Sequence, residues 1–113
     1  MKLLPALAVC IACAATTVLA QEKPITPLTG SDLAANWRVI DEMQDHGPVT
    51  LADGVLRLGA GMPMTGVAYT GKAELPVKDY EVSFEARRVE GEDFFAALTF
   101  PVRDKDTAAT WVL

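Results

Sequence analysis

The chain has 113 residues and a mass of 12.1 kDa, which gives room for one small domain. Half of its residues are hydrophobic, and 15 acidic residues against 10 basic ones give a formal charge of −5. This negative charge argues against nucleic-acid binding through a phosphate-neutralising surface, and against adsorption to an anionic membrane.

Residues 1–20 are typical of an export signal. Lys2 supplies a short basic start, an apolar stretch follows, and Val18 and Ala20 place small residues at the third-last and last positions. A membrane anchor is the alternative, but Pro5 interrupts the apolar stretch, which is shorter than the roughly 20 residues that span a bilayer. The sequence therefore predicts cleavage after Ala20, a secreted or periplasmic product, and no stable membrane insertion once the signal is removed.

Both cysteines, Cys10 and Cys13, lie inside this predicted signal. Neither has the residues that usually surround a lipid-attachment cysteine. The mature chain would contain no cysteine, so we expect neither disulfides nor thiolate metal sites, and its stability would come from packing.

Residues 21–30 contain two prolines and little periodicity, which predicts a flexible tether. Ser31 or Asp32 is placed to cap a short helical turn that reaches Asn36, because a side-chain oxygen there can accept the free amide protons of a first turn. Residues 37–40 then alternate as a strand does.

The next segments predict a β-hairpin. Residues 49–52 and 55–58 are rich in valine and leucine, and Asp53 and Gly54 between them readily adopt the positive φ values of a two-residue turn. After several glycines and a proline, residues 67–69 predict a further short strand.

The clearest strand pattern begins at residue 80. Two sets of side chains alternate there, an apolar set and a polar set: Tyr80, Val82, Phe84 and Ala86 against Glu81, Ser83, Glu85 and Arg87. The pattern predicts a strand with the first set buried. Residues 94–101 are apolar on both faces apart from one threonine, which predicts a central strand, and residues 107–113 predict a last strand.

No segment after residue 20 is typical of a long amphipathic helix. Short strands separated by turns predict an all-β fold, an antiparallel sandwich. Because the hydrophobic strand at 107–113 is followed by no turn and no polar tail, we expect the sandwich to be truncated, with residues 31–113 as its N-terminal part.

Three stretches resemble secreted bacterial proteins of the 3-keto-disaccharide hydrolase-like family: residues 53–56, 79–88 and 91–102. The resemblance covers residues 34 to 113. It implies a concanavalin A-like jelly roll, related in shape to laminarinase and laminin-G sandwiches, of which this chain would be the front half. It also implies a saccharide or glycoside ligand, although a shared fold does not carry a shared reaction.

Retaining glycoside hydrolysis needs two carboxyl groups about 5 to 5.5 Å apart. Glu81, Ser83 and Glu85 are similar to the Glu-x-Asp-x-Glu strand of laminarinase-like enzymes, with serine in place of the aspartate. On a strand the two glutamates share a face with Cα atoms about 13 Å apart, so both side chains would have to lean inward. Glu81 and Glu85 are thus the candidate catalytic pair, and solvated residues of an amphipathic strand are the alternative.

The candidate substrate-binding residues are Arg87, Phe95 and Thr99. Arg87 shares a face with Glu85 and could hold a sugar hydroxyl or carboxylate, or form a surface ion pair. Phe95 and Thr99 alternate with small Ala97 on one face, which suits a stacked sugar but also ordinary core packing.

The sequence predicts no metal site and no cofactor. His46 is the only histidine, so a zinc site is not expected. Two acidic runs could gather oxygen ligands for calcium, but neither has the spacing of a known calcium loop: Asp41, Glu42 and Asp45, and Asp104 with Asp106.

Two functions follow from this reasoning. The first is an exported carbohydrate-active domain resembling 3-keto-disaccharide hydrolases, inactive as the fragment given. The alternative is a non-catalytic laminin-G-like module that binds carbohydrate or protein.

Overall fold

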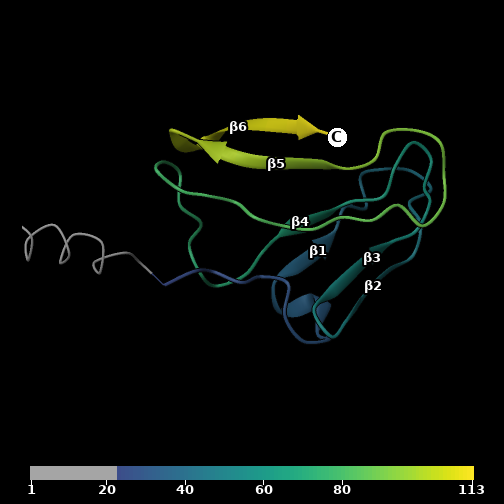
Figure 1. Ribbon diagram of the computed structural model, residues 1–113, viewed down its shortest axis with the longest axis horizontal. Coiled ribbons are helices and arrows are strands. Elements are labelled where there is room, and N and C mark those ends of the chain that lie inside the picture. The colour runs from purple at the N-terminus through teal and green to yellow at the C-terminus, as the bar shows by residue number, and fades with distance from the viewer. Residues whose placement is uncertain (1–22) are drawn as a thin grey trace, which may run out of the picture.

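The computed structural model describes residues 23–113 (Figure 1). The predicted export signal, both cysteines and the first two residues of the predicted tether lie outside the described residues. The elements are a 3₁₀ turn and six strands: η1 (Leu33–Ala35), β1 (Trp37–Val39), β2 (Val49–Ala52), β3 (Val55–Leu58), β4 (Val67–Tyr69), β5 (Ala97–Val102) and β6 (Asp104–Val112). Within this part of the chain, no helix is long and apolar enough to cross a membrane.

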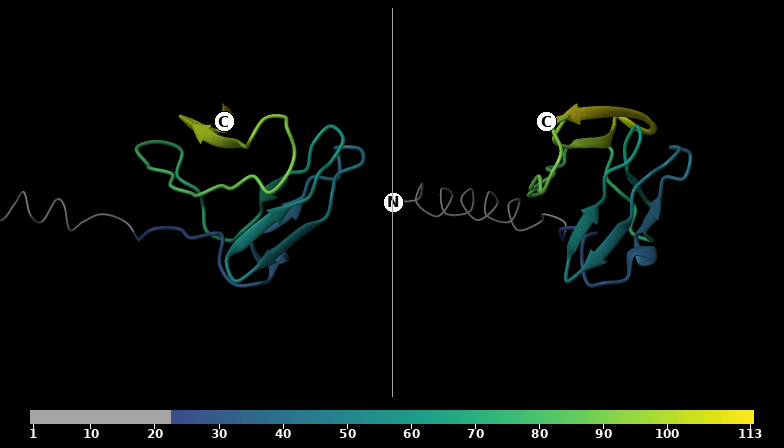
Figure 2. Two further views of the ribbon diagram at one scale, coloured as in Figure 1. Left: turned by 45° about the vertical axis from the view of Figure 1, so that its right-hand side comes forward. Right: turned by 90° about the vertical axis from the view of Figure 1, so that its right-hand side faces the viewer.

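The strands form three antiparallel pairs: β1 with β4, β2 with β3, and β5 with β6. The views in Figures 1 and 2 agree that β1 to β4 gather at one end of the described chain, whereas the β5–β6 hairpin lies apart from them. The fold is therefore all-β and antiparallel, as predicted; the strands form three two-stranded ribbons among the described residues, and their arrangement in a sandwich stays a prediction.

The β2–β3 hairpin has the predicted turn. Asp53 and Gly54 connect the strands with φ angles of 49° and 76°, the left-handed values that a tight two-residue turn requires. The register pairs Leu51 with Leu56. Leu51 is 7% exposed and is the one buried hydrophobic side chain among the described residues, so the packed core is very small.

The β1–β4 pair is held to the preceding segment by Trp37. Its ring meets Tyr69 edge to face, with centroids 5.7 Å apart, and its Nε1 donates a hydrogen bond to the carbonyl of Pro27 at 2.9 Å. Asp32 occupies the position before η1, but its side chain makes no capping hydrogen bond. Ser31 instead accepts a hydrogen bond from the amide of Asp53 at 3.1 Å, so the predicted capping role was wrong for both residues.

The predicted strand at residues 80–87 is not a strand in the structure. Val82 is 49% exposed and Phe84 40% exposed, Ala86 is exposed, and only Tyr80 is half-buried, so the predicted burial was also wrong. Alternation decides which side chains share a face, whereas a strand also needs a neighbouring backbone to take up its amide and carbonyl groups. Among the described residues, no strand pairs with this segment.

The predicted strand at 94–101 is confirmed from residue 97 onward, but its central position is not. Strand formation begins only at Ala97, and β5 has β6 as its one partner within residues 23–113. The predicted last strand is confirmed, and it starts three residues earlier than expected, at Asp104.

Candidate functional site

The β5–β6 hairpin presents two different faces. Leu98 pairs with Trp111, whereas Thr99 pairs with Thr110. Paired residues of an antiparallel ladder point to the same side, and successive residues point to opposite sides. Leu98, Phe100 and Trp111 therefore share an apolar face, and the two threonines lie on the other face, where their hydroxyls are 2.9 Å apart.

A groove of about 600 Å³ lies between this apolar face and the extended segment 77–84. In Figure 1 that segment belongs to the green chain that runs beside the hairpin. Apolar and aromatic side chains dominate the lining, and three charged residues complete it: Val77, Lys78, Asp79, Tyr80, Val82, Phe84, Leu98, Phe100, Pro101, Val102, Arg103 and Trp111. We call this the β5–β6 groove.

From Tyr80 onward, the segment contributes alternate residues to the groove. Tyr80, Val82 and Phe84 line it, whereas Glu81 and Glu85 do not. The hydroxyl of Tyr80 donates a hydrogen bond to the backbone carbonyl of Pro101 and so ties the segment to β5. The predicted two-sided pattern is therefore present, but its apolar side faces a groove and not a closed core.

The charged residues of the groove lie at tight bends. Asp79 and Arg103 have φ angles of 54° and 68°, in the left-handed region that few residues with a side chain occupy. Arg103 alone connects β5 to β6. Together with Lys78, these residues give the apolar groove a polar end that contains both signs of charge.

None of the predicted site residues lines the β5–β6 groove. Glu81, Glu85 and Arg87 are all exposed, and none of them lines the groove. Thr99 points away from the groove, toward Thr110. Phe95 is 38% exposed and also lies outside the groove lining.

The ring of Phe95 lies beside a positively charged side chain, that of Arg88. The guanidinium carbon of Arg88 lies 5.5 Å from the ring centroid, within the range of a cation–π contact. Sequence reasoning placed Arg88 on the face opposite Arg87 but assigned it no such partner. The contact gives Phe95 a local packing role.

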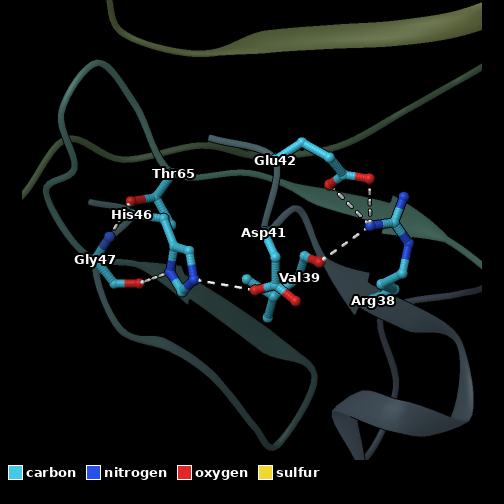
Figure 3. A network of polar contacts seen from close by, with 7 residues as sticks. All are labelled: Arg38, Val39, Asp41, Glu42, His46, Gly47 and Thr65. Carbon is cyan, nitrogen blue, oxygen red and sulfur yellow. Dashed lines mark hydrogen bonds and ion pairs between the residues drawn. The ribbon is translucent and has the colours of Figure 1, made fainter. Parts of the chain in front are cut away.

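A second group of polar residues surrounds His46 (Figure 3). Its Nε2 lies 3.1 Å from a carboxylate oxygen of Asp41, and its Nδ1 lies 2.9 Å from the carbonyl of Gly47. The amide of Gly47 donates to the hydroxyl of Thr65 at 2.7 Å. Both ring nitrogens face acceptors, which only the doubly protonated imidazolium can satisfy. The contact with the Gly47 carbonyl, aided by Asp41, raises the pKa of His46.

Arg38 lies in the same region and pairs with Glu42. Its guanidinium nitrogen is 3.1 and 3.2 Å from the two carboxylate oxygens (Figure 3). A backbone hydrogen bond at Glu42 lowers the pKa of Glu42 most, and the hydrogen bond from Arg38 lowers it further. Both side chains are at least half exposed, so the pair adds little to stability.

Three of the acidic residues considered for calcium have other partners. Asp41 and Glu42 contact His46 and Arg38, while Asp104 accepts the amide of Asp106 at 2.9 Å. The hydrogen bond with the Thr107 side chain lowers the pKa of Asp104 most, and the hydrogen bond from the Asp106 amide lowers it further. Within residues 23–113, no group of three or more histidine, cysteine or acidic side chains is arranged to hold a metal ion.

Sequence reasoning missed the groove because it assigned Tyr80, Val82 and Phe84 to a buried core. Two signals were available, the alternation from Tyr80 to Phe84 and the apolar face formed by Leu98, Phe100 and Trp111. Each pattern identifies an apolar face correctly. Neither pattern shows whether another layer covers that face, and in the structure Trp111 is 58% exposed.

Comparison of the chain with protein-family models, with curated proteins and with solved structures found no match.

Proposed function

We propose that this chain is an exported carbohydrate-active domain of the jelly-roll type, and that its described part contributes saccharide binding. Export follows from the pattern of residues 1–20, and mass spectrometry of the exported protein should give a chain that begins at Gln21. An exported product that retains Met1 would contradict this part of the proposal.

The observation that supports saccharide binding is the aromatic lining of the β5–β6 groove. Tyr80, Phe84, Phe100 and Trp111 all line it. Sugar rings stack their C–H faces on aromatic side chains, and the volume of about 600 Å³ lies within the range of about 300–1,000 Å³ that is common for small-ligand sites. The groove has the size and the chemistry for a disaccharide.

The charged end of the groove supplies the polar contacts that a saccharide requires. Lys78 and Arg103 can donate hydrogen bonds to hydroxyl or keto oxygens, and Asp79 can accept from hydroxyls. A ligand that joins an apolar ring face to a row of hydroxyls therefore matches both parts of the lining.

Binding is the better-supported role because a single carboxylate lines the groove. Glu81 and Glu85 do not line the groove, and Asp79 is the sole carboxylate among the described residues that do. Glycoside hydrolysis ordinarily uses two carboxyl groups, one on each side of the scissile bond. Catalysis by the glutamates thus stays a prediction from sequence.

Two phenylalanines allow a matched test. Phe84 lines the groove and is 40% exposed, whereas Phe94 lies outside it and is 42% exposed. A 3-keto-disaccharide and its parent disaccharide should be titrated into wild type, Phe84→Ala and Phe94→Ala by calorimetry. Loss of one stacking contact should weaken binding about 2- to 10-fold in Phe84→Ala, with Phe94→Ala unchanged.

Two results would refute the assignment. One is the absence of binding by folded wild-type protein at millimolar ligand. The other is an equal loss in both variants, which would place the ligand elsewhere. Turnover of the 3-keto-disaccharide that disappears in Glu81→Gln or Glu85→Gln would instead assign a hydrolase.

A further inference from the structure

The polar end of the β5–β6 groove carries more positive than negative charge. Lys78 and Arg103 contribute two cations and Asp79 one carboxylate, which leaves one positive charge in excess. The chain as a whole has a formal charge of −5, so this end of the groove has the sign opposite to that of the protein. At physiological salt the Debye length is about 8 Å, so a ligand in the groove responds to these three groups more than to distant acidic residues.

The three charged groups at this end are available to a ligand. All three residues are exposed, and within residues 23–113 none of them takes part in an ion pair. Arg38, by contrast, is paired with Glu42. An anion that enters the groove can therefore bind Lys78 and Arg103 without displacing another residue.

Arg103 occupies its position at a conformational cost. It connects β5 to β6 by itself and has a φ angle of 68°. Glycine adopts such angles freely, and aspartate tolerates them better than arginine does. Residues held in this region cluster at ligand sites, where the side chain has a task. A guanidinium at the end of an apolar groove suits one such task, because its planar fork can donate two parallel hydrogen bonds to a carboxylate.

We propose that the β5–β6 groove prefers an acidic saccharide, a disaccharide that contains a uronate residue. This inference rests on the saccharide binding proposed above. The sugar ring stacks on the aromatic lining, the carboxylate accepts hydrogen bonds from Arg103 and Lys78, and Asp79 accepts one from a sugar hydroxyl. The single negative charge of a uronate balances the excess charge of this end of the groove.

Calorimetry with two disaccharides that differ at one carbon measures this preference. One ends in glucuronate and the other in glucose, so a carboxylate replaces a hydroxymethyl group. At low salt, wild type should bind the glucuronate disaccharide about 3- to 10-fold more tightly than the neutral one, as expected for charge-assisted hydrogen bonds at an exposed site. High salt should reduce this ratio of affinities and leave the affinity for the neutral disaccharide unchanged.

Two variants should change the ratio in opposite directions. Arg103→Gln removes the guanidinium fork and should bring the ratio to about one. Asp79→Asn removes the carboxylate that repels the ligand and should raise the ratio, and asparagine tolerates the left-handed backbone at this position.

Lys105→Gln is the matched control. Lys105 lies on β6, two residues after Arg103, but it does not line the groove. Its substitution removes the same charge from the same hairpin, so the ratio should stay that of wild type. A loss of the preference in Lys105→Gln equal to that in Arg103→Gln would show a general effect of chain charge and would overturn the role of Arg103.

The neutral disaccharide separates this proposal from the proposed function. If wild type binds the neutral disaccharide and binds the glucuronate form no more tightly, the acidic preference is overturned while saccharide binding stands. If wild type binds neither, saccharide binding itself is refuted. A disaccharide with a sulfate ester at the same carbon carries the same charge on a tetrahedral group, and an equal gain in its affinity would overturn the assignment of a carboxylate.

Discussion

Two glycines at the turn of the β2–β3 hairpin allow two costs of an alanine substitution to be separated: the cost of a left-handed backbone and the cost of a steric contact made by the added Cβ. Gly54 and Gly30 both have left-handed φ angles, of 76° and 65°, and the amide of Gly54 donates to the carbonyl of Gly30 at 2.8 Å. A Cβ at Gly54 would lie 3.2 Å from the carbonyl oxygen of Leu28, whereas a Cβ at Gly30 would meet nothing within 4 Å.

Alanine at either position should therefore destabilise the fold by different amounts. Left-handed φ costs a residue with a side chain about 1–2 kcal/mol, and a stiffer unfolded chain returns about 0.4–1 kcal/mol of this. Gly30→Ala should lower the free energy of unfolding by about 1 kcal/mol. Gly54→Ala should lower it by about 2 kcal/mol, because moving the Leu28 carbonyl away also strains the bond to Gly30.

Urea unfolding of wild type and both variants, followed by tryptophan fluorescence, measures these differences. The unfolding curves of the two variants should have the same dependence on urea concentration as wild type, and their midpoint urea concentrations should differ from each other. Equal midpoints for the variants would show that the approach of Leu28 costs nothing, and a stabilised Gly54→Ala would refute the turn geometry itself.

Leu51→Ala should lower the free energy of unfolding by about 2–4 kcal/mol, whereas Phe84→Ala should lower it by only about 1 kcal/mol because the Phe84 side chain is 40% exposed. The same urea experiment tests both values, and a larger cost for Phe84→Ala would contradict the place of Phe84 in an open groove. Asp41→Asn should lower the pKa of His46 only in part, since the Gly47 carbonyl is the larger cause of its rise, and an unchanged NMR titration would show that the Asp41 contact does not form. Folding stabilises the protonated form of His46. The contribution of His46 to the free energy of unfolding should therefore be complete below its ordinary pKa of 6.5 and be lost as the pH rises through the raised pKa. Urea midpoints measured between about pH 5 and 8 would detect this loss.

Local sequence patterns predicted the elements that depend on neighbouring residues. Asp53 and Gly54 specify the β2–β3 hairpin because their left-handed φ angles are a local property of the chain. The short strands β1, β4 and β6 were likewise predicted from β-branched and aromatic residues. The alternation from Tyr80 to Phe84 correctly separated the side chains that line the groove from those that do not.

The tertiary arrangement decided which apolar faces are covered, and no local pattern contains that information. Phe84 and Trp111 have the sequence context of core residues, yet they line a groove because no further layer lies over them among the described residues. Burial depends on partners that are distant in sequence, and so does strand pairing, because amides and carbonyls need a neighbouring backbone. For the same reason the sequence proposed Phe95 and Thr99 as substrate-binding residues on one face, whereas the register of β5 with β6 turned Thr99 away from the groove.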